Sequence, residues 1–182
     1  MELSNSSEIR RILNKYGFTF SKALGQNFII NPSVCPKMAE LGNASPGFGV
    51  LEIGPGIGVL TKELALRADR VVAVELDNRL LPVLEETLSE FDNVRIVHGD
   101  ALKIDLRKLI ETEFPGKPVA VCANLPYYIT SPVIMHLLES RLPIQSITVM
   151  VQKEAAARIC ATPGSRDVGA VSLAVRYFSS PR

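Results

Sequence analysis

Small or polar residues follow four successive apolar runs of the chain, and their types suit the binding of a nucleoside. They are Gly54, Gly56 and Gly58 after the first run, Glu75 at the end of the second, Asp100 after the third and Asn124 after the fourth. Glycines at alternate positions let the backbone turn tightly and approach a ligand with no side chain in between. If the four runs are strands of one parallel sheet, these residues meet in one crevice beyond the strand ends.

The two acidic residues indicate which ligand the crevice takes. Glu75 stands 21 residues after Gly54, where a carboxylate can accept hydrogen bonds from both hydroxyl groups of a ribose. Asp100 can accept a hydrogen bond from the exocyclic amine of adenine. The glycine spacing is GxGxG and not the GxGxxG that holds a dinucleotide pyrophosphate. S-adenosyl-L-methionine, an adenosine compound without a pyrophosphate, therefore fits best, and NAD remains the alternative.

The elements that must position these residues alternate along the chain. Apolar runs and helical patterns follow one another, which predicts a doubly wound, mostly parallel sheet with helices on both faces, a Rossmann-like α/β fold. The predicted strands are continuous apolar runs, as strands buried on both faces should be. They cover residues 49–53, 71–75, 94–97, 119–123, 146–151 and 171–178. The predicted helices cover residues 58–67, 78–90, 106–111, 131–139 and 153–161.

The chain is predicted to form one domain over residues 1–182, because its 182 residues match a single core and no linker divides them. The sheet core occupies residues 46–182. Residues 1–45 hold two helices and an irregular segment between them. Asn5 and Glu8 form a capping box for the first helix, and Gly17 ends it. The second helix begins near Pro32 or Pro36.

Composition favours a folded protein of the cytoplasm. The hydrophobic fraction is 47%, no apolar stretch approaches the ~20 residues of a membrane-spanning helix, and the N-terminus lacks the order of a signal peptide. The three cysteines are far apart, and Cys122 lies inside an apolar run, which indicates a small buried hydrophobe. His98 and His136 have no partners at metal-ligand spacing, so no metal site is expected.

Stretches over about residues 20–178 resemble the successive motifs of the ribosomal RNA adenine dimethyltransferases. They read LEIGPGIGVLT, VVAVELD, VHGDALKID, NLPYYITSPV and MVQKEAAARI, with KALGQNFIIN as the N-terminal motif. Gly25 before Gln-Asn-Phe, and the run from Tyr128 to Pro132, resemble the small-subunit branch more than the macrolide-resistance branch. The resemblance implies S-adenosyl-L-methionine as cofactor and N6,N6-dimethylation of two adjacent adenines near the 3′ end of 16S rRNA, during ribosome assembly.

The resemblance also implies roles for single residues of the cofactor site. Asn27 and Ile29 would cover the methionine part of the cofactor, while Gly54, in the same turn as Gly56, would contact it. Glu75 would hold the ribose and Asp100 the adenine amine. Asn124 would touch both the cofactor and the target base.

Four consecutive residues, Asn124-Leu125-Pro126-Tyr127, would carry the catalysis. The exocyclic nitrogen of adenine is a poor nucleophile because its lone pair is delocalised into the ring. The Asn124 side-chain oxygen and the backbone carbonyl of Leu125 or Pro126 can accept its two hydrogens and direct the lone pair at the methyl group. Tyr127 offers a stacking face for an extruded base, worth roughly 1–3 kcal/mol. No general base is needed. We assign Tyr128 to packing.

Gln152, which follows the fifth apolar run, belongs to one of these motifs. Helix capping and solvent exposure explain it almost as well as a role in the site, so it is not assigned to the site.

Family members continue past the last residue of this chain, so we expect a truncated form without the closing strand and the C-terminal RNA-binding domain. Such a form should bind the cofactor and act poorly or not at all on RNA of the immature 30S subunit. We expect a monomer, with the unpaired edge of the last strand, 171–178, as the place where chains could associate. Two alternatives stay open. One is a macrolide-resistance-type methyltransferase of large-subunit rRNA, and the other is a non-catalytic assembly or transcription factor with the same fold.

Overall fold

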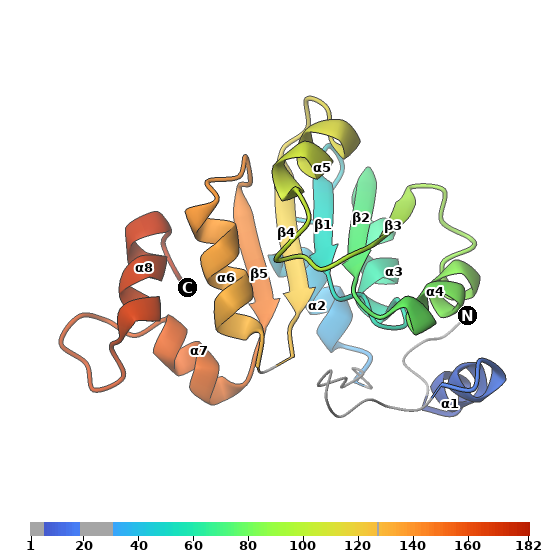
Figure 1. Cartoon of the computed structure of the whole chain (residues 1–182), viewed down its shortest axis with the longest axis horizontal. Coiled ribbons are helices and arrows are strands. Elements are labelled where there is room, and N and C mark those ends of the chain that lie inside the picture. The colour runs from blue at the N-terminus through green and yellow to red at the C-terminus, as the bar shows by residue number, and fades with distance from the viewer. Residues whose placement is uncertain (1–5, 19–30, 127) are drawn as a thin grey trace.

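The computed structural model describes residues 6–18, 31–126 and 128–182, and these residues form a five-stranded sheet. All neighbouring strands are parallel, and their spatial order is β3-β2-β1-β4-β5 (Figure 1). The strands are β1 (Gly49–Ile53), β2 (Arg70–Glu75), β3 (Val94–His98), β4 (Val119–Asn124) and β5 (Ser146–Met150). The first five predicted strands are therefore confirmed to within one residue at each end. The order reverses between β1 and β4, as in doubly wound folds.

Helices lie before, between and after the strands, and those between them are where the pattern predicts. They are α1 (Ser6–Lys15), α2 (Val34–Leu41), α3 (Val59–Ala65), the 3₁₀ helix η2 (Asn78–Leu80), α4 (Leu81–Thr87), α5 (Leu106–Glu113), α6 (Thr130–Glu139), α7 (Lys153–Ile159) and α8 (Ala170–Phe178). Gly17 has φ +60° and ends α1 as expected. The predicted irregular segment falls mostly on residues 19–30, which lie outside the described residues.

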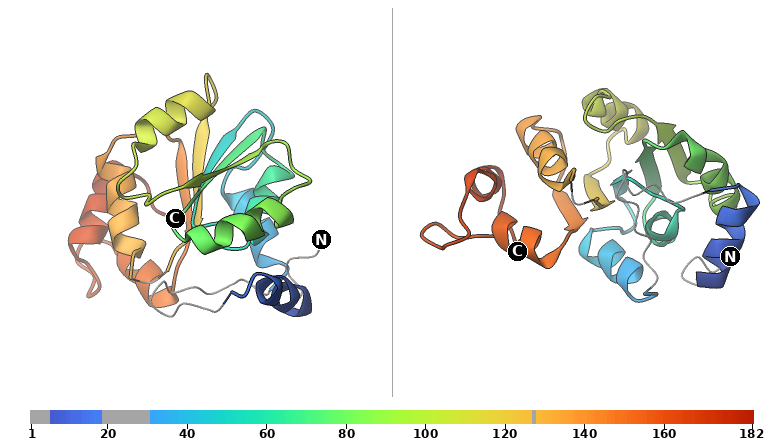
Figure 2. Two further views of the ribbon diagram at one scale, coloured as in Figure 1. Left: turned by 45° about the vertical axis from the view of Figure 1, so that its right-hand side comes forward. Right: turned by 60° about the horizontal axis from the view of Figure 1, so that its bottom comes forward.

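Helices cover both faces of the sheet, because alternate residues of each buried strand point to opposite sides. On β1, Leu51 and Ile53 pack in the cluster that holds the apolar residues of α5 and α6. Val50 packs on the opposite side, in the cluster formed with α2 and α3. Figure 2 shows the same division, with α5 and α6 on one side of the sheet and α2 and α3 on the other. Helices thus bury both faces of the central strands, and a ligand can reach these strands only at their ends.

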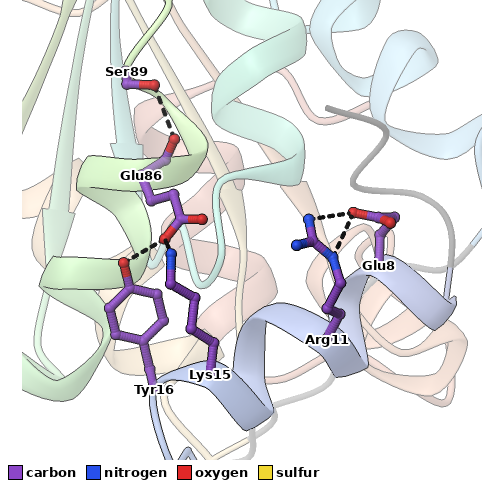
Figure 3. A network of polar contacts seen from close by, with 6 residues as sticks. All are labelled: Glu8, Arg11, Lys15, Tyr16, Glu86 and Ser89. Atoms are coloured by element: carbon purple, nitrogen blue, oxygen red, sulfur yellow. Dashed lines mark hydrogen bonds and ion pairs between the residues drawn. The ribbon is translucent and has the colours of Figure 1, made fainter.

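Helix α1 is fastened to α4, far from it in sequence. Ile9, Ile12 and Leu13 pack against the apolar side of η2 and α4. At the end of the helix, Lys15 pairs with Glu86 at 2.6 Å, and the Tyr16 hydroxyl donates to the same carboxylate (Figure 3). Both hydrogen bonds hold the pKa of Glu86 below its usual value. The chain leading to position 18 therefore has a fixed place beside η2 and α4.

The sixth predicted strand, residues 171–178, is wrong, because this segment forms α8. An apolar run of this length fits either a buried strand or a helix, and polar contacts decide here. The Gly169 N–H donates to Ser172 Oγ at 2.9 Å, which caps the start of the helix. Nε and Nη2 of Arg176 donate to the carbonyls of Ala161 and Cys160, both at 2.8 Å. No strand edge exists at 171–178 through which chains could associate.

Strand β1 carries one acidic residue into the interior. Glu52 is 1% exposed, and among the described residues its Oε2 atom has no hydrogen-bond partner. Burial raises the pKa of Glu52 to about 8, and the nearby carboxylate of Glu75 adds to this rise. The carboxyl group of Glu52 is therefore protonated at neutral pH.

The cap of α8 gives a first prediction. Ser172→Ala leaves the Gly169 N–H without its acceptor, so the free energy of unfolding should fall by about 0.5–2 kcal/mol. Urea unfolding measures this change, with Ser89→Ala, an exposed serine just after α4, as the control. A strand at 171–178 would instead leave both variants close to the unmodified protein.

Glu52 gives a prediction about pH. The folded protein keeps the Glu52 proton up to about pH 8, whereas the unfolded chain releases it near the ordinary value of 4.5. The free energy of unfolding should therefore decrease as the pH rises from 4.5 to 8, and Glu52→Gln should remove this decrease, on the order of a few kcal/mol. Urea unfolding across this range tests the difference. Parallel pH curves for the two proteins would contradict the buried, protonated carboxyl.

Candidate functional site

A cavity of about 470 Å³ opens beyond the carboxyl ends of the strands. Residues at or just after the ends of all five strands line it. This is the expected place for a ligand in a doubly wound sheet, and the volume lies in the range of small-molecule sites. Seven residues predicted from the sequence line the cavity together: Gly54, Gly56, Glu75, Asp100, Asn124, Leu125 and Pro126.

The glycine turn after β1 needs its glycines for two different reasons. Gly54, Gly56 and Gly58 all have positive φ angles, of 72°, 62° and 91°, which residues with a side chain rarely adopt. At Gly58 a Cβ atom would in addition lie 3.1 Å from Leu88. Gly54 has open space beside it, so there the conformation alone demands glycine. The turn thus exposes bare backbone at the cavity, as the spacing predicted.

Glu75 is held from two sides at the end of β2. The Gly56 N–H donates to Oε2 at 3.2 Å, and the Asp77 N–H donates to Oε1 at 2.8 Å. Burial raises the pKa of this 6%-exposed residue, and the two N–H groups oppose the rise. Each oxygen keeps a second lone pair that can accept from a ligand. The carboxylate is therefore oriented for a bidentate partner such as two adjacent hydroxyl groups.

Asp100 follows β3 and is half-buried. Its Oδ1 accepts from the Leu102 N–H at 3.0 Å, and its Oδ2 lies 3.4 Å from Lys103 Nζ. The Lys103 side chain is 81% exposed, so this ion pair stabilises little and can open. A ligand amine can then take the place of the lysine.

The turn after β4 presents acceptor groups beside the end of β5. The Leu125 N–H donates to the Met150 carbonyl at 3.3 Å, which carries the pairing of the two strands into the turn. The Pro126 carbonyl accepts from the Ile129 N–H and the Thr130 hydroxyl, both at 3.1 Å. Two hydrogen bonds use both lone pairs of this carbonyl. The Leu125 carbonyl is therefore the better acceptor for a ligand at this turn.

Three predicted site residues, Asn27, Ile29 and Tyr127, lie outside the described residues, so their roles stay predictions. Tyr128 lines the cavity with 57% of its surface exposed, whereas the sequence suggested packing. A tyrosine in a turn after a strand has no apolar periodicity to show which way it faces.

The cavity lining also includes polar residues that the sequence did not assign to it, among them Glu52, Asp77 and Gln152. Each of the three has a feature in the sequence that could have indicated a role in the site. Glu52 is a charged residue inside an apolar strand, Asp77 stands two positions after Glu75, and Gln152 follows β5 as Asn124 ends β4.

The Cys122 thiol lies in the core of the protein. Burial raises the pKa of the Cys122 thiol to about 12, and this residue is fully buried, which confirms it as a small hydrophobe. Within residues 6–18, 31–126 and 128–182, no three His, Cys, Asp or Glu side chains gather to hold a metal ion. In the same part of the chain no helix is long and apolar enough to cross a membrane.

Two solved structures are similar in fold. A dimethyladenosine transferase from Plasmodium falciparum superposes with a TM-score of 0.67 at 30% identity, covering 80% of this chain and 50% of that one. The 23S rRNA methyltransferase ErmE gives a TM-score of 0.63 at 36% identity, covering 72% of this chain and 50% of that one.

Relatives in sequence span the whole chain. Two proteins described as ribosomal RNA small subunit methyltransferase A come from Alkaliphilus oremlandii and Shouchella clausii. The first is 49% identical over 99% of this chain and 63% of its own length. The second is 50% identical over 100% of this chain and 62% of its own length. The chain thus spans less than two thirds of these relatives. A family model described as ribosomal RNA adenine dimethylase matches residues 17–181, so the protein belongs to the ribosomal RNA adenine dimethylase family.

Proposed function

We propose that residues 1–182 form the S-adenosyl-L-methionine-binding domain of a methyltransferase that dimethylates adenine N6 in small-subunit rRNA. One observation carries the proposal: a bidentate carboxylate, an amide and a backbone carbonyl line one cavity at the strand ends. Glu75 suits a ribose, and Asn124 with Leu125 suits the two hydrogens of an amine. The names of the relatives at 49% and 50% identity support the choice of substrate.

The residues of the cavity fit the cofactor by their chemistry. Glu75 accepts from both ribose hydroxyls while its other lone pairs stay bonded to Gly56 and Asp77. Asp100 accepts from the adenine amine once Lys103 has moved away. The glycine turn leaves room for the ligand to approach the backbone, and Asn27 and Ile29 complete the site. When bound, the cofactor supplies a methyl group on a positively charged sulfur.

The chain activates the target by positioning it. Asn124 Oδ1 and the Leu125 carbonyl each accept one hydrogen of the adenine amine, which draws the nitrogen towards tetrahedral geometry and fixes the direction of its lone pair. The Pro126 ring restricts the turn and so aims the carbonyl. Tyr127 stacks on the base. The methylated amine loses its proton to water, so no basic side chain is required, and most of the rate enhancement comes from orientation.

Small-subunit RNA is the favoured substrate over large-subunit RNA. The relatives named for the small subunit are more similar to this chain than ErmE is, at 36% identity. Such an enzyme acts in the cytoplasm on immature 30S particles during ribosome assembly, and we propose that this chain is a monomer there. A non-catalytic assembly factor is disfavoured, because a binder has no use for paired acceptors at an amine.

Glu75→Ala should weaken binding of S-adenosyl-L-methionine about ten- to a hundred-fold, because a charge-assisted acceptor is lost. Calorimetric titration of the chain measures this, with NAD as the competing ligand and Glu111→Ala on the exposed side of α5 as the matched control. If Glu75→Ala left the affinity unchanged, the ribose would bind elsewhere. If NAD bound more tightly than S-adenosyl-L-methionine, NAD would be the cofactor.

Asn124→Ala should lower methyl transfer by roughly 10² or more while folding survives. The assay uses residues 1–182 joined to the carboxy-terminal remainder of the Shouchella clausii relative, with tritiated cofactor and unmethylated 30S particles. Gln145→Ala, an exposed amide at the opposite end of β5, is the control.

Two results of this assay would count against the proposal. Near-normal turnover by Asn124→Ala would refute the role of the amide. Label appearing in 50S particles and not in 30S particles would reassign the substrate to large-subunit RNA.

A further inference from the structure

A chain of contacts leads away from the cavity, starting at the carboxylate of Glu75. The Asp77 N–H donates to Glu75 Oε1 at 2.8 Å. The carboxylate of Asp77 is in turn gripped by Arg79: Oδ1 accepts from the backbone N–H at 3.1 Å and from Nε at 2.8 Å, and Oδ2 accepts from Nη2 at 2.6 Å. The Asp77 side chain is only 5% exposed. The turn that holds Glu75 is thus fixed by a bidentate guanidinium.

The same guanidinium also fixes the chain that follows α1. Arg79 Cζ lies 4.9 Å from the centre of the Phe18 ring, within the range of a cation–π contact. Phe18 is 8% exposed, and its N–H donates to the Leu13 carbonyl at 2.8 Å. Arg79 therefore joins the end of α1 to the turn at the end of β2.

We propose that Arg79 is a positioning residue for the cofactor, acting through Asp77 on Glu75 without lining the cavity itself. This rests on the proposed function, because it needs Glu75 to hold the ribose. With Arg79 in place, the Asp77 turn keeps its N–H on Glu75 and Phe18 keeps its place beside the turn. Without Arg79, the turn relaxes and Glu75 loses one of the two donors that orient it.

A purely structural role makes a different prediction. Arg79 is 46% exposed, and an ion pair at such a site contributes little to the free energy of unfolding. A loss of cofactor affinity that exceeds any loss of stability therefore distinguishes positioning from general support of the fold.

The pH dependence of cofactor binding gives a second way to distinguish positioning from general support of the fold. The negative charge of Asp77 raises the pKa of Glu75, and Arg79 lies against that charge. Among the described residues, further ionisable groups near Glu75 are Glu52 on β1, His98 opposite it on β3, and Asp100, which lines the same cavity. All three remain in an Arg79 variant. Removing Arg79 should thus move the loss of cofactor binding at acidic pH to a higher pH, because Glu75 then takes up its proton earlier.

The test is calorimetric titration of S-adenosyl-L-methionine at several pH values, together with urea unfolding. Arg79→Ala should weaken binding about tenfold, and Arg79→Lys, which keeps a cation beside Asp77 but not the bidentate contact, should restore the pH profile and only part of the affinity. Arg67→Ala is the matched control, since Arg67 also pairs with an acidic neighbour, Glu63, but lies outside the cavity. It should leave affinity unchanged at a similar cost in stability.

The outcomes separate the two proposals. If the unmodified chain binds the cofactor and Glu75→Ala weakens it, but Arg79→Ala binds normally with an unshifted pH profile, the positioning role is refuted and the proposed function stands. Equal losses of affinity in the Arg79 and Arg67 variants would also refute it. No binding by the unmodified chain would overturn both.

Discussion

The carboxylate of Glu75, held between the N–H groups of Gly56 and Asp77, is the interaction on which the site depends. It joins the glycine turn after β1 to the end of β2, so the two central strands present their ends in one fixed relation. A buried carboxylate is costly to keep charged unless hydrogen bonds favour the charged form. The two N–H groups supply such bonds and still leave a lone pair on each oxygen. The same arrangement thereby keeps the group in the fold and prepares it for a ligand.

The buried acidic residues around the cavity make the fold less stable than apolar residues at the same positions would. Glu52 is buried with an oxygen that has no partner among the described residues, and Glu75 is buried with a raised pKa. A core built for stability alone would place apolar residues at both positions. Functional sites often keep such groups, because a ligand with complementary donors or positive charge then binds to a site that is already oriented.

The strands and the cavity could be predicted from the sequence because both depend on simple rules. Continuous apolar runs predicted β1 to β5, and parallel strands bring the residues after them to one edge, so Gly54, Glu75, Asp100 and Asn124 were found together. Residues 170–178 could not be predicted in this way. Their apolar pattern fits two structures, and contacts made by Ser172 and Arg176 decided between them. The choice of the Leu125 carbonyl over that of Pro126 likewise depends on hydrogen bonds to Ile129 and Thr130 that no spacing reveals.

In the proposed complex, Glu75 binds the ribose while it keeps both of its backbone donors. A crystal structure of the chain with S-adenosyl-L-homocysteine, the product left after methyl transfer, would show whether it does. We expect the two ribose hydroxyls within hydrogen-bonding distance of Oε1 and Oε2 of Glu75, with the Gly56 and Asp77 N–H groups still in place. A ribose bound elsewhere, or a Glu75 side chain released from both donors, would refute this role of Glu75.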